Sequence, residues 1–206
     1  GIEINRIIAY KPLLDEALQK SKHKVHCSIV YQRKQQPCEL VAGRDLDWQQ
    51  QMLFAEPAAC VPVLATDPLY ILYTSGTTGT PKGVQRDTGG HAVALATAMD
   101  FVYNGKAGET FWAISDIGWA VGHSFSIYAP LLTGMTSIIY EGLPTTPNPG
   151  IWWRIVEANK VNILLTAPTG VRMLRKQDEM WMSRHDISSL KSFFLAGEPL
   201  DEPTAQ

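Results

Sequence analysis

The stretch 161–170, "VNILLTAPTG", decides the fold, because a run of apolar residues ends in a loop of hydroxyl, proline and glycine residues. The run is apolar on both faces, which is typical of a parallel strand that helices cover on two sides. Residues 169–176 follow at once and have the pattern of a helix. The stretch therefore predicts a strand, a loop and a helix of an α/β fold.

Similar units recur along the 206 residues of the chain. The expected strands are 25–31, 69–73, 110–114, 136–140, 161–165 and 192–196. The expected helices are 13–20, 46–55, 90–101, 124–132, 151–158 and 169–176. This alternation predicts an α/β fold with a parallel-rich sheet flanked by helices. Three prolines in residues 55–68 predict a connector, which divides the chain into 1–65 and 66–206.

Composition excludes several classes of protein. The chain is 45% hydrophobic and carries a net charge of −2, which gives no sign of a nucleic-acid surface. It has no apolar run of membrane length, and its first ten residues do not form a signal peptide. Its three cysteines include no CxxC pair, so we assign no metal ligand and expect free thiols. These features predict a soluble cytoplasmic protein that binds neither membrane nor nucleic acid.

Four unusual loops each follow a predicted strand. Their sequences are "TSGTTG" at 74–79, "SDIGWAVGH" at 115–123, "TAPTG" at 166–170 and "AGEPL" at 196–200. In open α/β sheets, ligands bind beyond the carboxyl ends of the strands. We therefore expect the four loops to form one site.

The loop at 74–83 has the composition of a phosphate cradle. It offers five hydroxyl side chains, three glycines whose backbone can approach an anion closely, and the charge of Lys82. It does not match the P-loop pattern, because Pro81 stands where GxxxxGK[ST] requires glycine. A phosphotransferase remains an alternative, but Asp87 is the only acid near the loop and nothing marks it as a base.

The segment "YTSGTTGTPKGV" at 73–84 resembles the phosphate-binding signature of the adenylate-forming superfamily, which includes acyl-CoA synthetases, luciferases and peptide-synthetase adenylation domains. Residues 115–144, 161–174 and 193–204 resemble the acetyl- and propionyl-CoA synthetase branch, and the propionyl enzymes most closely. The resemblance implies an ATP-dependent ligase that forms an acyl-adenylate, releases pyrophosphate and transfers the acyl group to coenzyme A. Propionate, ATP, Mg²⁺ and coenzyme A are its implied substrates and cofactors.

The resemblance also implies roles for individual residues. The implied ATP-binding residues are Thr74, Ser75, Gly76, Thr77, Thr78, Gly79, Lys82, Gly197, Glu198 and Pro199, with Lys82 also catalytic. The implied acyl pocket consists of Trp119, Ala120, Val121 and Ala196, and the implied coenzyme A contacts are Val121 and Ala167. The two alanines imply a pocket wide enough for propionate, because one methylene discriminates by about 1–3 kcal/mol.

Members of this superfamily are longer than this chain. The resemblance implies that 1–65 and 66–206 are incomplete parts of a large N-terminal domain and that the small C-terminal domain is absent. We therefore expect the chain by itself to be a fragment with little activity. Preference for acetate or butyrate, and a non-catalytic nucleotide-binding remnant, remain alternatives.

Overall fold

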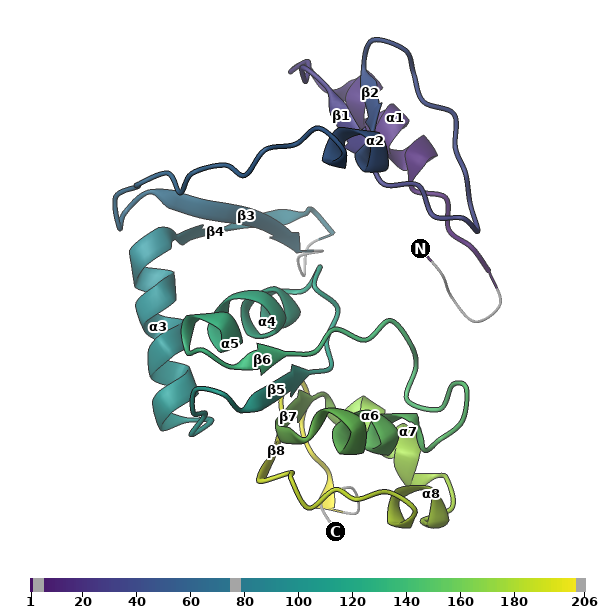
Figure 1. The fold of residues 1–206 in the computed structure, drawn as a ribbon, viewed down its shortest axis with the longest axis vertical. Coiled ribbons are helices and arrows are strands. Elements are labelled where there is room, and N and C mark those ends of the chain that lie inside the picture. Colours follow the sequence, from purple (N-terminus) through teal and green to yellow (C-terminus); the bar gives the residue numbers. More distant parts are fainter. Residues whose placement is uncertain (2–5, 75–78, 203–206) are drawn as a thin grey trace. The chain divides into compact units, whose positions relative to one another are not determined.

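The computed structural model describes residues 1, 6–74 and 79–202, and these form two units, Gly1–Val61 and Pro62–Gln206 (Figure 1). Each unit is described by itself. None of the helices among the described residues is both long and apolar enough to span a bilayer.

The unit Gly1–Val61 contains two helices and two short parallel strands. In chain order these are α1 (Lys11–Lys20), β1 (Ser28–Val30), β2 (Asp45–Asp47) and α2 (Trp48–Met52). The predicted helix 46–55 extends three residues beyond the end of α2. The sequence also did not predict β2, so the first two residues of that predicted helix are wrong. The reason is the side chain of Asp47, which accepts a hydrogen bond from the Gln50 amide and so caps α2 only after β2 has ended.

The unit Pro62–Gln206 is built on a parallel sheet of four strands in the order β6-β5-β7-β8. The strands are β5 (Thr110–Ala113), β6 (Thr136–Ser137), β7 (Val161–Thr166) and β8 (Ser192–Leu195). All three neighbouring pairs are parallel, and helices lie on both sides of the sheet (Figure 1). The predicted fold class is confirmed, although β6 is much shorter than the expected strand 136–140.

Helices cover both faces of this sheet. They are α3 (Thr88–Phe101), α4 (Ala120–Gly122), a π-helix (His123–Tyr128), α5 (Ala129–Leu132), α6 (Ile151–Asn159), α7 (Pro168–Arg175) and α8 (Met180–Ser183). The helix predicted at 124–132 begins earlier, at Ala120, and changes its hydrogen-bond pattern part-way along. The sequence did not predict α8.

Alternating side chains of the central strands enter two hydrophobic cores. Phe111 of β5 and Ile163 of β7 pack against Leu95 and Met99 of α3 on one face. On the other face, a second core is formed by Trp112 and Leu164 of the sheet with Trp152 and Val156 of α6. Because both faces are buried, β5 and β7 are mostly apolar, as the sequence pattern indicated, and Thr110, Asn162 and Thr166 are their polar residues.

The segment before the phosphate-type loop does not belong to this sheet. Residues 68–74 form β3 (Pro68–Thr74), which pairs antiparallel with β4 (Lys82–Asp87) in a separate two-stranded sheet. The expectation that the strand 69–73 belongs to the parallel-rich sheet is wrong. Ile71 and Tyr73 are 55% and 67% exposed, so one face of the apolar run "LYILY" is open in this part of the chain.

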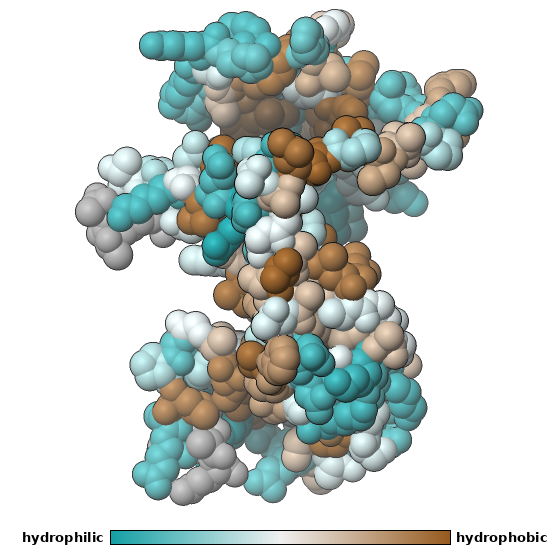
Figure 2. Space-filling view, turned by 90° about the vertical axis from the view of Figure 1, so that its left-hand side faces the viewer, coloured by the Kyte–Doolittle hydropathy of each residue, from teal (hydrophilic) through white to brown (hydrophobic). Residues whose placement is uncertain are grey.

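Helix α3 also leaves apolar side chains uncovered. Leu95 and Met99 are buried, whereas Val93, Phe101 and Val102 near or on α3 are exposed. Figure 2 views the chain from the side that α3 occupies in Figure 1 and shows apolar surface there. The helix is thus nearly apolar all round, and only one stripe of it reaches the core.

We expect Leu164→Ala in the full-length protein to lower the free energy of unfolding by about 2–5 kcal/mol, because it opens a cavity beneath a fully buried side chain. The matched control is Leu131→Ala, since Leu131 is 62% exposed and the same change there should cost about 0.5 kcal/mol or less. Urea unfolding followed by tryptophan fluorescence measures both variants. Equal losses in the two variants would contradict the assignment of Leu164 to the core.

Candidate functional site

The topology of the parallel sheet defines a place for a ligand. The chain leaves β5 for β6 on one side, and returns to β7 on the other side of β5. Such a reversal opens a crevice at the carboxyl ends of the two diverging strands, where ligands of open α/β sheets bind. A cavity of about 390 Å³ lies at this position. It is lined by Ile114, Ser115, Asp116, Trp119, Val121, Leu165, Thr166, Ala167, Ala196, Gly197 and Glu198.

The segment after β5 forms one wall of this cavity. The Asp116 side chain accepts a hydrogen bond from the Gly118 amide at 2.6 Å, and the Asp116 carbonyl accepts one from the Trp119 amide at 3.0 Å. Trp119 then precedes α4, and both Trp119 and Val121 line the cavity. Ala120 begins α4 and does not line the cavity, although the sequence placed it in the same pocket.

Gly122 allows this wall to fold tightly. A Cβ atom at position 122 would lie 2.1 Å from the carbonyl oxygen of Asp116 and 3.0 Å from that of Ser115. Both contacts are to backbone atoms, which cannot rotate away as a side chain can. Glycine at 122 is therefore required for the close approach of α4 to the segment that leaves β5.

The ends of β7 and β8 form the opposite wall. Ala167 is the residue before α7, and its extended backbone turns the chain from strand to helix. The amide of Ala196 donates to the carbonyl of Thr166 at 3.0 Å, which continues the pairing of the two strands beyond their ends. Gly197 follows with φ of +95°, a conformation that favours glycine. The structure thus brings Ala167, Ala196 and Gly197 together, as the sequence predicted for the loops after these strands.

The segment 74–79 connects β3 to β4, which pair antiparallel in a sheet separate from the parallel one. Thr74 pairs with Lys82 at the end of these strands, and Gly79 has φ of +76°. Ser75, Gly76, Thr77 and Thr78 lie outside the described residues. The other three predicted loops meet at the carboxyl edge of the parallel sheet.

Aromatic contacts attach the hairpin to the cavity wall. The ring of Tyr70 on β3 lies 4.5 Å from the ring of His123, and stacks on Tyr128 at 5.9 Å between centroids. His123 begins the π-helix that follows α4, and its Nδ1 lies 3.1 Å from the carbonyl oxygen of Ile117. The hairpin therefore contacts the same wall segment that lines the cavity. Short π-helices of this kind are frequent at functional sites.

His91 lies beneath these contacts. Its Nε2 lies 3.4 Å from the Tyr70 hydroxyl and 3.5 Å from the Ser124 hydroxyl, and its side chain is buried. Burial lowers the pKa of His91, since a charged imidazole loses hydration there, and the positive charge of Arg86 acts in the same direction. His91 is consequently neutral at pH 7. The sequence did not single out this residue, because a histidine on a helix carries no signal of its own.

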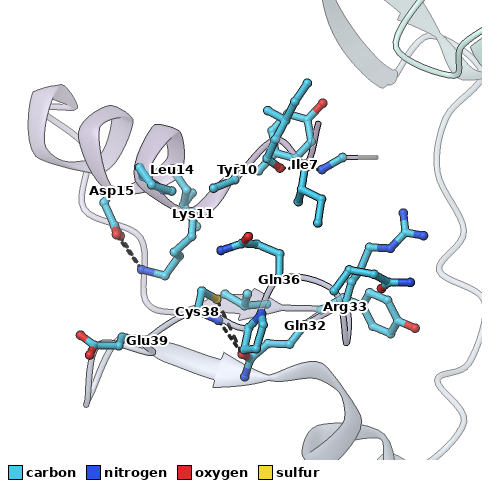
Figure 3. A pocket seen from close by; sticks show the side chains of 18 of the residues that line it. Ile7, Tyr10, Lys11, Leu14, Asp15, Gln32, Arg33, Gln36, Cys38 and Glu39 are labelled. Atoms are coloured by element: carbon cyan, nitrogen blue, oxygen red, sulfur yellow. Dashed lines mark hydrogen bonds and ion pairs between the residues drawn. The ribbon is translucent and has the colours of Figure 1, made fainter. Parts of the chain in front are cut away.

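A further cavity of about 830 Å³ lies within Gly1–Val61, beside α1, and Figure 3 shows its side chains. The Lys11 ammonium at its wall contacts Asp15 at 2.7 Å and Asp45 at 2.9 Å. Arg44 also bonds Asp45, whose side chain is fully buried, and lowers the pKa of that carboxyl. These charges compensate one another, and removal of any one of them would leave an unpaired charge beside the buried Asp45. None of the predicted site residues lies in this unit.

The described residues contain no group of three or more His, Cys, Asp and Glu side chains that could hold a metal ion. A family model described as AMP-binding enzyme matches residues 3–206. The chain belongs to this family. The resemblance found in the sequence is thereby confirmed at the level of the AMP-binding enzymes.

This AMP-binding chain has similar relatives in bacteria and animals. It is 51% identical over 211 residues to propionate–CoA ligase of Salmonella typhimurium, and 50% identical over 208 residues to propionate–CoA ligase of Escherichia coli. It is 47% identical over 210 residues to the mitochondrial acyl-CoA synthetase short-chain family member 3 of Rattus norvegicus. Each alignment includes 100% of this chain but only 33%, 33% and 31% of the respective relative. The chain thus spans about a third of the length of these relatives.

We expect Gly122→Ala in the full-length protein to impair the site, because its Cβ atom forces the backbone at Asp116 away from α4. Such a displacement of the cavity wall by about 1 Å should lower kcat/KM about 10²-fold. Gly118→Ala is the matched control, since its Cβ would meet only side-chain atoms of Asp116, at 3.0 Å, and no backbone atom. Steady-state kinetics of both variants, with ATP-dependent thioester formation as the assay, compares them. Near-normal kinetics of Gly122→Ala would show that the wall tolerates displacement.

Proposed function

We propose that this chain is part of an ATP-dependent acid–thiol ligase that forms a short-chain acyl-CoA, with propionate as the preferred acid. The observation that carries the proposal is the cavity at the sheet's switch point, where Trp119, Ala167 and the 196–198 turn meet. The names of its relatives, propionate–CoA ligase and short-chain acyl-CoA synthetase, support the same reaction class. We propose the cytoplasm as its location.

In the proposed first step, an oxygen of the carboxylate attacks the α-phosphorus of ATP, and the bond from that phosphorus to the bridging oxygen breaks to release pyrophosphate. No general base is needed, because a short fatty acid is already ionised at pH 7. The barrier is electrostatic, since one anion approaches another, and donors that neutralise the triphosphate lower it. In our proposal these donors are Lys82, Thr74 and residues 75–79.

In the proposed second step, the sulfur of coenzyme A attacks the acyl carbon of the adenylate, and AMP leaves. The proposed contacts for coenzyme A are Val121 and the backbone at Ala167, and both residues line the cavity. Mg²⁺ enters the proposal as an ion that accompanies ATP and neutralises part of its charge. The adenine would lie against the 197–199 turn, whose backbone is shaped by the positive φ of Gly197.

The proposed acyl pocket lies at Trp119, Ala120, Val121 and Ala196. Of these, Trp119, Val121 and Ala196 line the cavity, and Ala196 is the smallest of the three. A methyl side chain at 196 leaves room beside the acyl chain, which supports propionate over acetate in our proposal.

The proposal is tested by incubating the full-length protein with ATP, Mg²⁺ and coenzyme A together with acetate, propionate or butyrate. We expect propionyl-CoA, AMP and pyrophosphate in equal amounts, with the highest kcat/KM for propionate. Highest activity with acetate or butyrate would overturn the acid preference but not the reaction class. Formation of ADP, or no thioester with any acid, would overturn the reaction class.

We expect Ala196→Val to shift preference from propionate toward acetate, because two added methyl groups narrow the cavity. The ratio of kcat/KM for propionate to that for acetate should fall about 10- to 200-fold, the range that one methylene can discriminate. Ala196→Gly is the matched opposite change and should favour butyrate. If both variants keep the wild-type order of acids, Ala196 does not contact the acyl chain.

We expect Lys82→Ala to lower the rate of ATP–pyrophosphate exchange about 10²- to 10³-fold, which is the usual loss on removing one donor from a developing anion. Lys106→Ala is the control. Lys106 lies after α3, is exposed, and pairs with Asp100 of that helix. Isotope exchange between pyrophosphate and ATP, with propionate present, isolates the first step. Equal exchange rates for the two variants would remove Lys82 from the catalytic role.

A further inference from the structure

Glu198 lies in the turn that the sequence assigned to the nucleotide, but its carboxylate already accepts hydrogen bonds from other residues of the chain. Its Oε1 accepts a hydrogen bond from the Thr169 amide at 2.9 Å and a second one from the Thr169 hydroxyl. Its Oε2 accepts a hydrogen bond from Nη1 of Arg172 at 2.9 Å. Both oxygens therefore face α7, although the residue itself lines the cavity.

Arg172 extends this contact along the turn that follows Glu198. Its Nη2 donates to the backbone carbonyl of Pro199 at 3.0 Å, and its Nε donates to Asp201 at 2.8 Å. One guanidinium thus bonds Glu198, Pro199 and Asp201 through three different nitrogen atoms. The single nitrogen of a lysine side chain does not offer this planar fork of donors. The hydrogen bond from Arg172 to Asp201 and the one to Glu198 raise the pKa of Arg172, so its charge is permanent.

The contact of Glu198 with α7 determines where the negative charge of its carboxylate lies. The hydrogen bonds from Thr169, followed by that from Arg172, lower the pKa of Glu198, so its carboxylate is ionised at pH 7. An ionised carboxylate released into the cavity would lose these hydrogen bonds and place a negative charge in a site that, in our proposal, binds a polyanionic nucleotide. Held by α7, the same charge faces away from the nucleotide and supports the helix start, where negative charge is favourable.

We propose that Thr169, Arg172 and Glu198 are positioning residues, which fasten the 197–199 turn to the first turns of α7 and so fix the surface on which the adenine lies. This inference rests on the proposed function for the identity of the nucleotide. Glu198 acts through the placement of the backbone on either side of it, and its carboxylate makes no contact with ATP.

The test compares Thr169→Val with Thr169→Ser in the full-length protein. Valine keeps the shape of threonine but removes the hydroxyl that bonds Glu198, whereas serine keeps that hydroxyl. We expect Thr169→Val to raise the KM for ATP about 3- to 10-fold, the effect of losing a hydrogen bond to a partly exposed charged group. The KM for propionate and the Tm should stay near the wild-type values, and Thr169→Ser should restore the KM for ATP.

Arg172→Gln provides a second variant, with Arg175→Gln as its matched control one helical turn further along α7. We expect the first to raise the KM for ATP by at least the same factor and the second to leave it unchanged. An unchanged KM for ATP in Thr169→Val and Arg172→Gln, an equal rise in the KM values for ATP and propionate, or failure of serine to rescue would each overturn the proposal.

Calorimetric titration with AMP separates this proposal from the proposed function. If the wild-type protein binds AMP but forms no thioester, the ligase assignment fails while the affinity ratio between Thr169→Val and Thr169→Ser still decides the positioning role. If the wild-type protein binds no nucleotide, both fail.

Discussion

The parallel pairing of β5 with β7 constrains the position of every other part of the Pro62–Gln206 unit. Hydrogen bonds align Phe111 with Ile163 and Trp112 with Leu164, so side chains of like orientation stand next to each other on the two strands. Two separate cores form from this register, one on each face. A slip of one residue would exchange the faces and direct the side chain of Trp112 into the core built for Phe111. The register also places the ends of the strands side by side, and the cavity begins there.

The cavity is assembled from backbone turns more than from reactive side chains. Gly122 lets α4 approach the segment after β5, Ala167 turns the chain into α7, and Gly197 adopts positive φ after β8. This construction suits the proposed reaction, because acyl adenylation requires the placement of two anions and needs no side chain to remove a proton. Side chains with chemical function, such as Asp116 and Glu198, are bonded to backbone amides and hold the walls.

The sequence predicted the parallel sheet and its flanking helices because β5, β7 and α6 carry their burial pattern locally. It could not predict that β3 leaves this sheet, since an apolar run looks the same in a parallel sheet and in a hairpin with one open face. The choice depends on β4, whose residues Lys82–Asp87 are mostly polar and gave no strand signal. The cavity residues Ile114 and Leu165 were missed, because the sequence placed both inside strands. Ser115 and Thr166 lie in loops that the sequence assigned to the site, but they received no individual role.

Glu198 illustrates why a motif and its individual side chains must be considered separately. The sequence places this residue in a nucleotide-binding turn, and the position of the turn beside the cavity agrees with such a role. A carboxylate has about four acceptor sites, and here the Thr169 amide, its hydroxyl and Arg172 use three of them, on both oxygens. An uncompensated negative charge in a site for a polyanionic nucleotide would also oppose binding. In our proposal, hydrogen bonding and charge therefore both assign the carboxylate to the support of the turn and leave recognition of the nucleotide to its backbone.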